Sequence, residues 1–306
     1  MGLFKEKKIY SKINEIKFKK AKDTLMHGTL VLEGGAFRGL YTSGVLDCLM
    51  DHNINLDNVI GISAGALNGV NYLAGCRGRT AHCLLKHRFD PRYLGWRALK
   101  ESGSIVNFRY IFEDYNKDQE LDEERLFRND RHLYAGCANL NTGEVDYIET
   151  KDRTKFFKSV TASASMPLVS MMVRIDGNKY LDGGCITKLP IRFAIENKFD
   201  KIIFVATRPL DYRRKLITPE LKLEKIRYRN YPKFIEALKN TNKKYNQDAE
   251  FLELLASRGG IFVIAPSKYI AVSRLEGDEE KMGELYMLGY NDCNEKLGEI
   301  ENYLNI

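Results

Sequence analysis

The sequence predicts a layered α/β fold with a mainly parallel central sheet. Two apolar strand candidates, residues 29–33 and 59–62, each lead into a glycine-rich turn that a helical segment follows. Strand, turn and helix in direct succession require a crossover connection, so two such units in a row indicate parallel strands. The 306 residues, 44% of them apolar and 29% charged, suffice for a large globular core.

The first strand candidate ends in Gly34-Gly35-Ala36-Phe37-Arg38-Gly39, and a helix is expected to continue to about Met50. Unpaired amide N–H groups converge at such a junction and can hold an oxyanion. The alternative is a phosphate cradle for a nucleotide. The sequence fingerprint of such a nucleotide site requires a third glycine at the position of Ala36 and an acidic residue at the end of the next strand. The next strand leads to Ser63 instead, so the oxyanion interpretation is favoured.

The second strand candidate leads into Gly61-Ile62-Ser63-Ala64-Gly65. Gly-x-Ser-x-Gly between a strand and a helix is the nucleophile-elbow pattern, in which side chains at the two glycine positions would collide. The helix expected after Ser63 would direct its amino end at the group that the serine attacks. The pattern therefore predicts an activated serine.

Further along the chain, residues 93–131 lack clear periodicity and are interpreted as a lid-like or cap insertion. A hairpin turn at 176–178 and helical periodicity beyond residue 208 indicate the remaining elements. Strands are predicted at 133–138, 145–149, 173–175, 179–181, 202–206 and 261–265. A last helix is predicted from about Asp278, and one of its faces carries Met282, Leu285, Tyr286, Gly289, Leu297, Ile300 and Leu304.

A serine nucleophile needs a base, and the usual histidine has no obvious source here. The histidines are His27, His52, His82, His87 and His132. None lies after His132, so the carboxy-terminal histidine of the α/β-hydrolase order serine, acid, histidine is missing. His82 and His87 are expected to be solvent-exposed rather than catalytic. The alternative base is Asp182, which precedes Gly183 and Gly184; an ordinary Asp-Gly turn is the other interpretation. Partial burial beside Ser63 would raise the pKa of this aspartate.

Taken in this order, the Gly-Gly-x-x-Arg-Gly turn, the Gly-Ile-Ser-Ala-Gly elbow and the Asp-Gly-Gly turn resemble the patatin-like phospholipase family. The resemblance extends over residues 29–208 and includes Ser163-Ala164-Ser165-Met166-Pro167 and Pro190. It implies a three-layer α/β/α fold and lipid acyl hydrolysis by a Ser-Asp dyad that needs no metal or organic cofactor.

Carried over by position, the resemblance makes Ser63 the nucleophile and Asp182 the base. Gly34, Gly35 and Ala36 match the oxyanion turn, with Arg38 as its arginine. Ala36 departs from a triple glycine. Its amide can still donate, but the methyl group would cost strain if φ is positive.

The chain divides into a basic N-terminal tail (1–28), the catalytic domain (29–208) and a mainly helical C-terminal extension packing on that core (209–306). Eight lysines between Lys5 and Lys22 give the tail a net charge of about +5. These lysines, together with Ile9, Ile13, Ile16 and Phe18, suggest peripheral contact of the tail with an anionic membrane. The other interpretation is that the lysines form an ordinary solvent-exposed face. A second basic stretch covers 208–244, and no nucleic-acid motif accompanies either.

Neither a membrane-length apolar run nor a signal-peptide pattern is present, and the six cysteines are scattered. A cytoplasmic protein with reduced thiols and no metal site is therefore expected, with the membrane periphery as the alternative location. The predicted function is a serine acyl hydrolase for lipid esters. The alternatives are an acyltransferase, a lipid-binding protein that has lost activity, and a nucleotide-binding protein.

Overall fold

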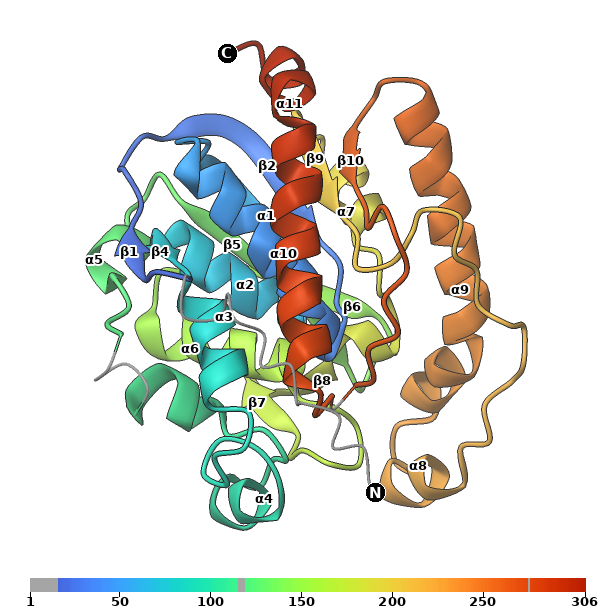
Figure 1. Ribbon diagram of the computed structural model, residues 1–306. Coiled ribbons are helices and arrows are strands. Elements are labelled where there is room, and N and C mark those ends of the chain that lie inside the picture. The colour runs from blue at the N-terminus through green and yellow to red at the C-terminus, as the bar shows by residue number, and fades with distance from the viewer. Residues whose placement is uncertain (1–15, 115–118, 275) are drawn as a thin grey trace, which may run out of the picture.

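The computed structural model describes residues 16–114, 119–274 and 276–306. Within them, an eight-stranded sheet has the order β10-β9-β2-β3-β5-β8-β7, with β6 paired to β5 (Figure 1). The strands are β2 Met26–Leu32, β3 Leu56–Ile62, β5 His132–Asn139, β6 Val145–Ile148, β7 Val173–Ile175, β8 Asn178–Asp182, β9 Ile202–Val205 and β10 Phe262–Ile264. Strands β10 to β5 are parallel, and β6, β8 and β7 are antiparallel. The predicted mainly parallel sheet is confirmed.

Helices cover both faces of the sheet. Successive strand residues point to opposite faces, and apolar residues on both faces need a covering layer. Leu30 and Leu32 of β2 join one core cluster, and Val31 joins another. The first face carries α1 (Gly39–Asp51), α2 (Ala64–Leu73), α3 (Arg79–Lys86), α6 (Arg153–Ala164) and α10 (Glu279–Glu295); the second carries α7 (Ile191–Glu196) and α9 (Pro232–Ser257). The three-layer arrangement is therefore confirmed.

Helix α10 lies against α1 in the outer layer, and glycines set their distance (Figure 1). A Cβ atom on Gly289 would lie 2.0 Å from the carbonyl oxygen of Tyr41, and one on Gly44 would lie 2.0 Å from that of Tyr286. Hydrogen bonds flank this contact: the Tyr41 hydroxyl donates to Asp292 (2.9 Å), and the Tyr286 hydroxyl donates to Asp47 (2.8 Å). The C-terminal segment is thus packed closely against α1, the first helix of the α/β fold.

The predicted last helix is two helices. Asp278 caps the start of α10 by accepting hydrogen bonds from the amides of Glu280 and Lys281, and a non-helical Lys296 separates α10 from α11 (Leu297–Leu304). The C-terminal segment also supplies β10, and it contains the short helix α8 (Lys222–Arg227). No helix in the described part of the chain has both the length and the apolar character needed to cross a bilayer.

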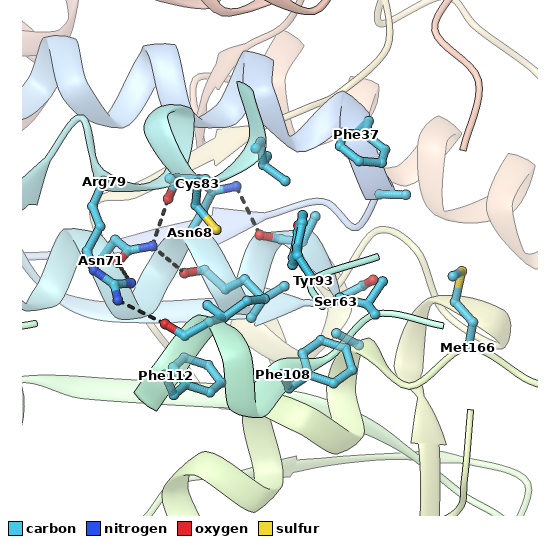
Figure 2. A pocket seen from close by; sticks show the side chains of 18 of the residues that line it. Phe37, Ser63, Asn68, Asn71, Arg79, Cys83, Tyr93, Phe108, Phe112 and Met166 are labelled. Carbon is cyan, nitrogen blue, oxygen red and sulfur yellow. Dashed lines mark hydrogen bonds between the residues drawn. The ribbon is translucent and has the colours of Figure 1, made fainter. Parts of the chain in front are cut away.

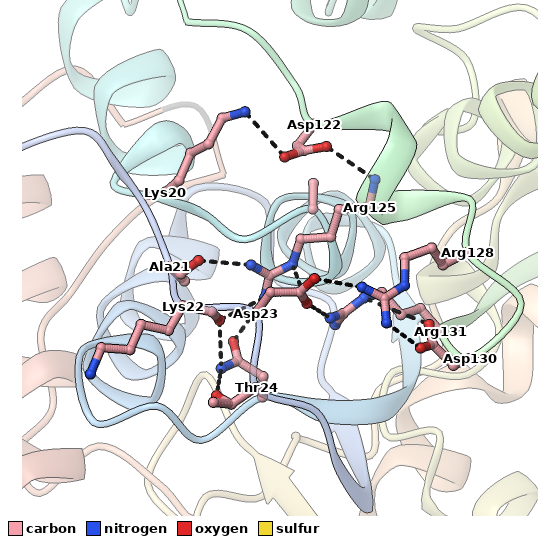
Figure 3. A network of polar contacts seen from close by, with 12 residues as sticks. Lys20, Ala21, Lys22, Asp23, Thr24, Asp122, Arg125, Arg128, Asp130 and Arg131 are labelled. Carbon is pink, nitrogen blue, oxygen red and sulfur yellow. Dashed lines mark hydrogen bonds and ion pairs between the residues drawn. The ribbon is translucent and has the colours of Figure 1, made fainter.

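Residues 20–24 are attached to the body of the protein by a polar network (Figure 3). Lys20 pairs with Asp122 (3.2 Å), Arg125 donates to the carbonyl of Ala21 (2.8 Å), and Asp23 pairs with the buried Arg131. Helix α5 (Glu123–Leu126) supplies Arg125.

Only part of the predicted basic tail, 1–28, lies within the described residues. Ile16 is buried, β1 (Lys19–Lys20) pairs with β4 (Cys76–Arg77), and Lys19 forms an ion pair with Asp51. Strand β2 begins at Met26, three residues earlier than predicted. The lysines from Lys5 to Lys12, with Ile9 and Ile13, lie outside the described residues.

Candidate active site

Ser63 occupies a strained turn between β3 and α2. Its φ of 56° and ψ of −121° place a non-glycine residue in the positive-φ region. A Cβ atom on Gly61 would lie 2.7 Å from the amide nitrogen of Ala66, and one on Gly65 would lie 2.5 Å from the carbonyl oxygen of Leu32. The turn therefore has the geometry of a nucleophile elbow, and close backbone contacts explain both glycines.

Asp182, the last residue of β8, faces the serine across this turn. The Ser63 hydroxyl donates to Oδ2 of Asp182 at 2.9 Å, although the two residues are 119 positions apart in the chain. The other carboxylate oxygen, Oδ1, accepts from the amide of Gly184 at 2.7 Å. Only 7% of Asp182 is exposed. The structure thus brings the predicted nucleophile and base into direct contact.

The pKa of Asp182 is raised, chiefly because burial disfavours its charged form. Hydrogen bonds from Ser63 and Gly184 and the positive charges of Lys188 and Arg274 oppose this rise without cancelling it. A raised pKa makes the carboxylate a stronger base than an exposed aspartate, which suits proton transfer from a hydroxyl group.

The glycine turn after β2 lies beside the elbow. A Cβ atom on Gly34 would be 3.3 Å from that of Ser63, and Ala36 lines the same pocket as Ser63. The amide of Gly34 donates to the carbonyl of Lys188 at 3.4 Å, whereas the amides of Gly35 and Ala36 make no backbone hydrogen bond with any described residue. Two N–H groups of the turn are therefore available to a ligand.

Ala36 has a φ of 49°, so it meets the condition under which its methyl group was expected to cost strain. The next polar residue of the turn, Arg38, is half-buried, and burial lowers the pKa of its guanidinium. The negative charge of the buried Glu33 partly opposes this effect. Glu33 also accepts a 2.6 Å hydrogen bond from the amide of Thr207 at the end of β9. Sequence reasoning missed Glu33, which connects the ends of two neighbouring strands.

Two further serines, Ser163 and Ser165, form hydrogen bonds with the backbone amides of Ser63 and Asp182. Sequence reasoning gave neither of them a role. The Ser163 hydroxyl accepts from the amide of Ser63 (3.0 Å) and donates to the carbonyl of Gly136 (2.7 Å). The carbonyl of Ser165 accepts from the amide of Asp182 (2.7 Å). Their place in the Ser-Ala-Ser-Met-Pro motif was the available signal.

A mostly apolar pocket opens beside Ser63 (Figure 2). One wall comes from α2 and α3, and the facing wall comes from the predicted insertion, which contains α4 (Trp96–Ser102) and a π-helical turn, η3 (Tyr110–Asp114). The apolar lining includes Leu67, Cys83, Leu84, Tyr93, Phe108, Ile111, Phe112 and Met166. A hydrocarbon chain attached to a group at Ser63 would find matching surface here.

The five histidines contact groups other than the serine–aspartate pair. His27, His87 and His132 contact Asp57, Tyr110 and Glu149 respectively. The expected exposure of His82 is wrong: it is 9% exposed, because residues 16–20 pack over α3 and the carbonyl of Ile16 meets its ring. Among the described residues, no cluster of His, Cys, Asp and Glu is suited to hold a metal ion.

Comparisons with known proteins identify the family to which the chain is similar. A family model described as patatin-like phospholipase matches residues 30–195, and a domain of unknown function, DUF6363, matches residues 231–305. An uncharacterized protein, YjjU, from Escherichia coli (strain K12) is 23% identical over 269 residues, or 85% of this chain and 74% of that protein. A probable lipid hydrolase, 463L, from Invertebrate iridescent virus 6 is 27% identical over 215 residues, or 61% of this chain and 72% of that protein.

Among solved structures, VipD from Legionella pneumophila aligns with a TM-score of 0.43 and 14% identity, over 92% of this chain and 70% of that one. The layered α/β fold and the family match together support lipid hydrolase activity in general. The chain belongs to the patatin-like phospholipase family, since the family model matches more than half of its residues.

Proposed function

We propose that this protein hydrolyses carboxylic esters of lipids through a Ser63–Asp182 dyad and an acyl-enzyme. The observation that carries the proposal is the 2.9 Å hydrogen bond from the Ser63 hydroxyl to a buried carboxylate whose pKa is raised. A hydroxyl that donates to a base is prepared to lose its proton as it attacks.

In the first half-reaction, Oγ of Ser63 attacks the carbonyl carbon of the ester while Asp182 takes the hydroxyl proton. The amides of Gly35 and Ala36 stabilise the negative oxygen of the tetrahedral intermediate, and each donor contributes about 3 kcal/mol of barrier lowering. The intermediate collapses, the bond to the alcohol breaks, and protonated Asp182 returns its proton to the leaving oxygen. An ester between the acyl group and Ser63 remains.

In the second half-reaction, Asp182 removes a proton from a water molecule that attacks the acyl-enzyme. The same amides hold the second oxyanion. The fatty acid leaves when Ser63 recovers its proton from Asp182. Both half-reactions use one base, so no imidazole is required.

The pocket supports a lipid as the source of the acyl group. Its lining next to Ser63 is dominated by aliphatic and aromatic side chains such as Leu67, Phe108 and Ile111. Burial of an acyl chain there contributes about 0.8 kcal/mol per methylene group. Long-chain esters should therefore be cleaved with a higher kcat/KM than acetyl esters.

The test compares Ser63→Ala with wild type on a panel of phospholipid, lysophospholipid, triglyceride and p-nitrophenyl esters. The variant should fold normally, lose hydrolysis of every ester and lose labelling by a fluorophosphonate probe. Ser257→Ala, at an exposed position at the end of α9, serves as the matched control and should keep both. Undiminished turnover by Ser63→Ala would refute the nucleophile. Acyl products on an added alcohol would indicate transfer instead of hydrolysis.

A further inference from the structure

Four cationic side chains, Lys188, Arg208, Arg214 and Arg274, surround Arg38 next to the dyad; they are called the basic cluster below. Strands β2 and β9 are parallel neighbours, with Leu32 opposite Val205. The residues after both strands therefore lie together, which brings Arg208 to the glycine turn. The hydrogen bond between Glu33 and Thr207 fixes this arrangement.

The other three members reach the same place from different parts of the chain. The carbonyl of Lys188 accepts from the amide of Gly34, and its ammonium group donates to the carbonyl of Gly184. Arg274, from the segment before α10, lines the pocket that contains Ser63. The backbone of Arg214 is fixed to Asn246 of α9 by two hydrogen bonds.

The electrostatics show that these charges act on one another. Burial lowers the pKa of Lys188 to about 8, and the nearby charge of Arg214 contributes in the same direction. After burial, the charges of Arg208, Arg214 and Arg274 also lower the pKa of Arg38. The charged forms of Lys188 and Arg38 are therefore destabilised by the positive charges around them.

The acidic groups Glu33 and Asp182 offset this positive charge only in part. Glu33 accepts from the amide of Thr207 and Asp182 accepts from Ser63, and within the described residues no member of the basic cluster forms an ion pair with either. The buried Nε atoms of Arg208, Arg214 and Arg38 have no hydrogen-bond partner among the residues that the structure describes. Among the described residues, the basic cluster has neutral partners, such as the rings of Tyr212 and Tyr245 beside Arg208 and Arg214, but no ion pair. An anion bound there would supply the missing counter-charge.

Building on the ester hydrolysis proposed above, we propose that the basic cluster binds the phosphate group of a phospholipid while Ser63 attacks the adjacent acyl ester. Arginine and lysine are the usual ligands of phosphate oxygens. In a phospholipid the phosphate and the esters share one glycerol, so a phosphate at the basic cluster leaves an ester carbonyl at Ser63 and an acyl chain in the apolar pocket. A neutral glyceride would leave the cations without a partner.

The test measures binding to the Ser63→Ala protein, which does not depend on turnover. Calorimetric titration compares dihexanoylphosphatidylcholine with dihexanoylglycerol, both as monomers, and inorganic phosphate serves as competitor. The phosphate-bearing lipid should bind about tenfold more tightly or better. Adding Arg208→Gln and Arg274→Gln should abolish most of this preference, and Arg258→Gln, an exposed control at the far end of α9, should leave it intact.

Arg274 is exposed, so Arg274→Gln alone offers a folded variant if the double substitution does not fold. It should still lower the lipid preference about threefold or more. Equal affinity for the two lipids, or a preference that survives the loss of both arginines, overturns the assignment. Inorganic phosphate that binds at the arginines without any arginine-dependent lipid preference would show a free-ion site and would overturn the headgroup role. A lipid preference in a protein whose wild type hydrolyses no ester would refute the dyad proposal alone.

Discussion

Replacing Asp182 with asparagine should separate the catalytic role of this residue from its structural role. The two side chains have nearly the same shape, and the asparagine oxygen can keep the 2.7 Å hydrogen bond from the amide of Gly184. The NH₂ group then faces the Ser63 hydroxyl, where it donates instead of accepting. Because no second base contacts the Ser63 hydroxyl within the described part of the chain, we expect kcat for a lipid ester to fall at least about 1,000-fold, or about 4 kcal/mol of transition-state stabilisation.

The same substitution should raise thermal stability at neutral pH. Burial raises the pKa of Asp182 in the folded state above its unfolded value. The contribution of this carboxyl group to stability is therefore present below its unfolded pKa and is lost as pH rises through the higher folded pKa. A neutral amide does not suffer that loss. The difference in melting temperature between Asp182→Asn and wild type should grow from pH 4 to neutral pH.

Steady-state kinetics and melting curves over this pH range provide both measurements. The control is Asp176→Asn, in the exposed hairpin turn between β7 and β8, which should change neither quantity by much. A variant that keeps more than about a tenth of wild-type kcat would show that Asp182 is not the base. A melting temperature that falls at neutral pH would contradict the argument from burial.

Two further predictions concern backbone contacts. Ala36→Gly removes a methyl group from a residue at φ 49°, so unfolding free energy should rise by up to about 1 kcal/mol once the greater freedom of unfolded glycine is subtracted. A stability loss in chemical denaturation would contradict strain at this turn. Gly289→Ala places a Cβ atom 2.0 Å from a carbonyl oxygen of α1 and should cost about 3 kcal/mol or more. Gly298→Ala, with nothing within 4 Å, should instead stabilise α11 by up to about 1 kcal/mol, and equal effects of the two changes would refute the packing argument.

The sequence was informative wherever a local rule determines the structure. The glycines around Ser63 predict the elbow because a Cβ atom at either position would lie too close to backbone atoms: 2.7 Å at Gly61 and 2.5 Å at Gly65. The parallel strands followed from strand–turn–helix succession for the same reason. Proximity of Ser63 to Asp182 did not follow from any local rule, because it depends on the register between β5 and β8.

Other features depend on contacts between distant segments, and there the sequence misled or gave no signal. His82 lies in a polar stretch, but burial by residues 16–20 decides its exposure. Arg208 and Arg214 belong to a basic stretch that plain solvation explained equally well. Their position beside Arg38 requires β9 to pair with β2, which no pattern near residue 208 encodes.

The site also draws on more of the chain than the segment that the patatin-like model matches, residues 30–195. The C-terminal part, which includes the DUF6363 match, supplies Arg274 to the pocket and adds its charge to the surroundings of Asp182. It also buries Tyr41 and Asp47 of α1 under α10, so its removal would expose polar groups that now bond across that interface. Since α1 begins where the glycine turn 34–39 ends, a loosened α1 would disturb the amides next to Ser63. The C-terminal segment therefore helps to hold the glycine turn beside Ser63, and it places the positive charge of Arg274 near Asp182.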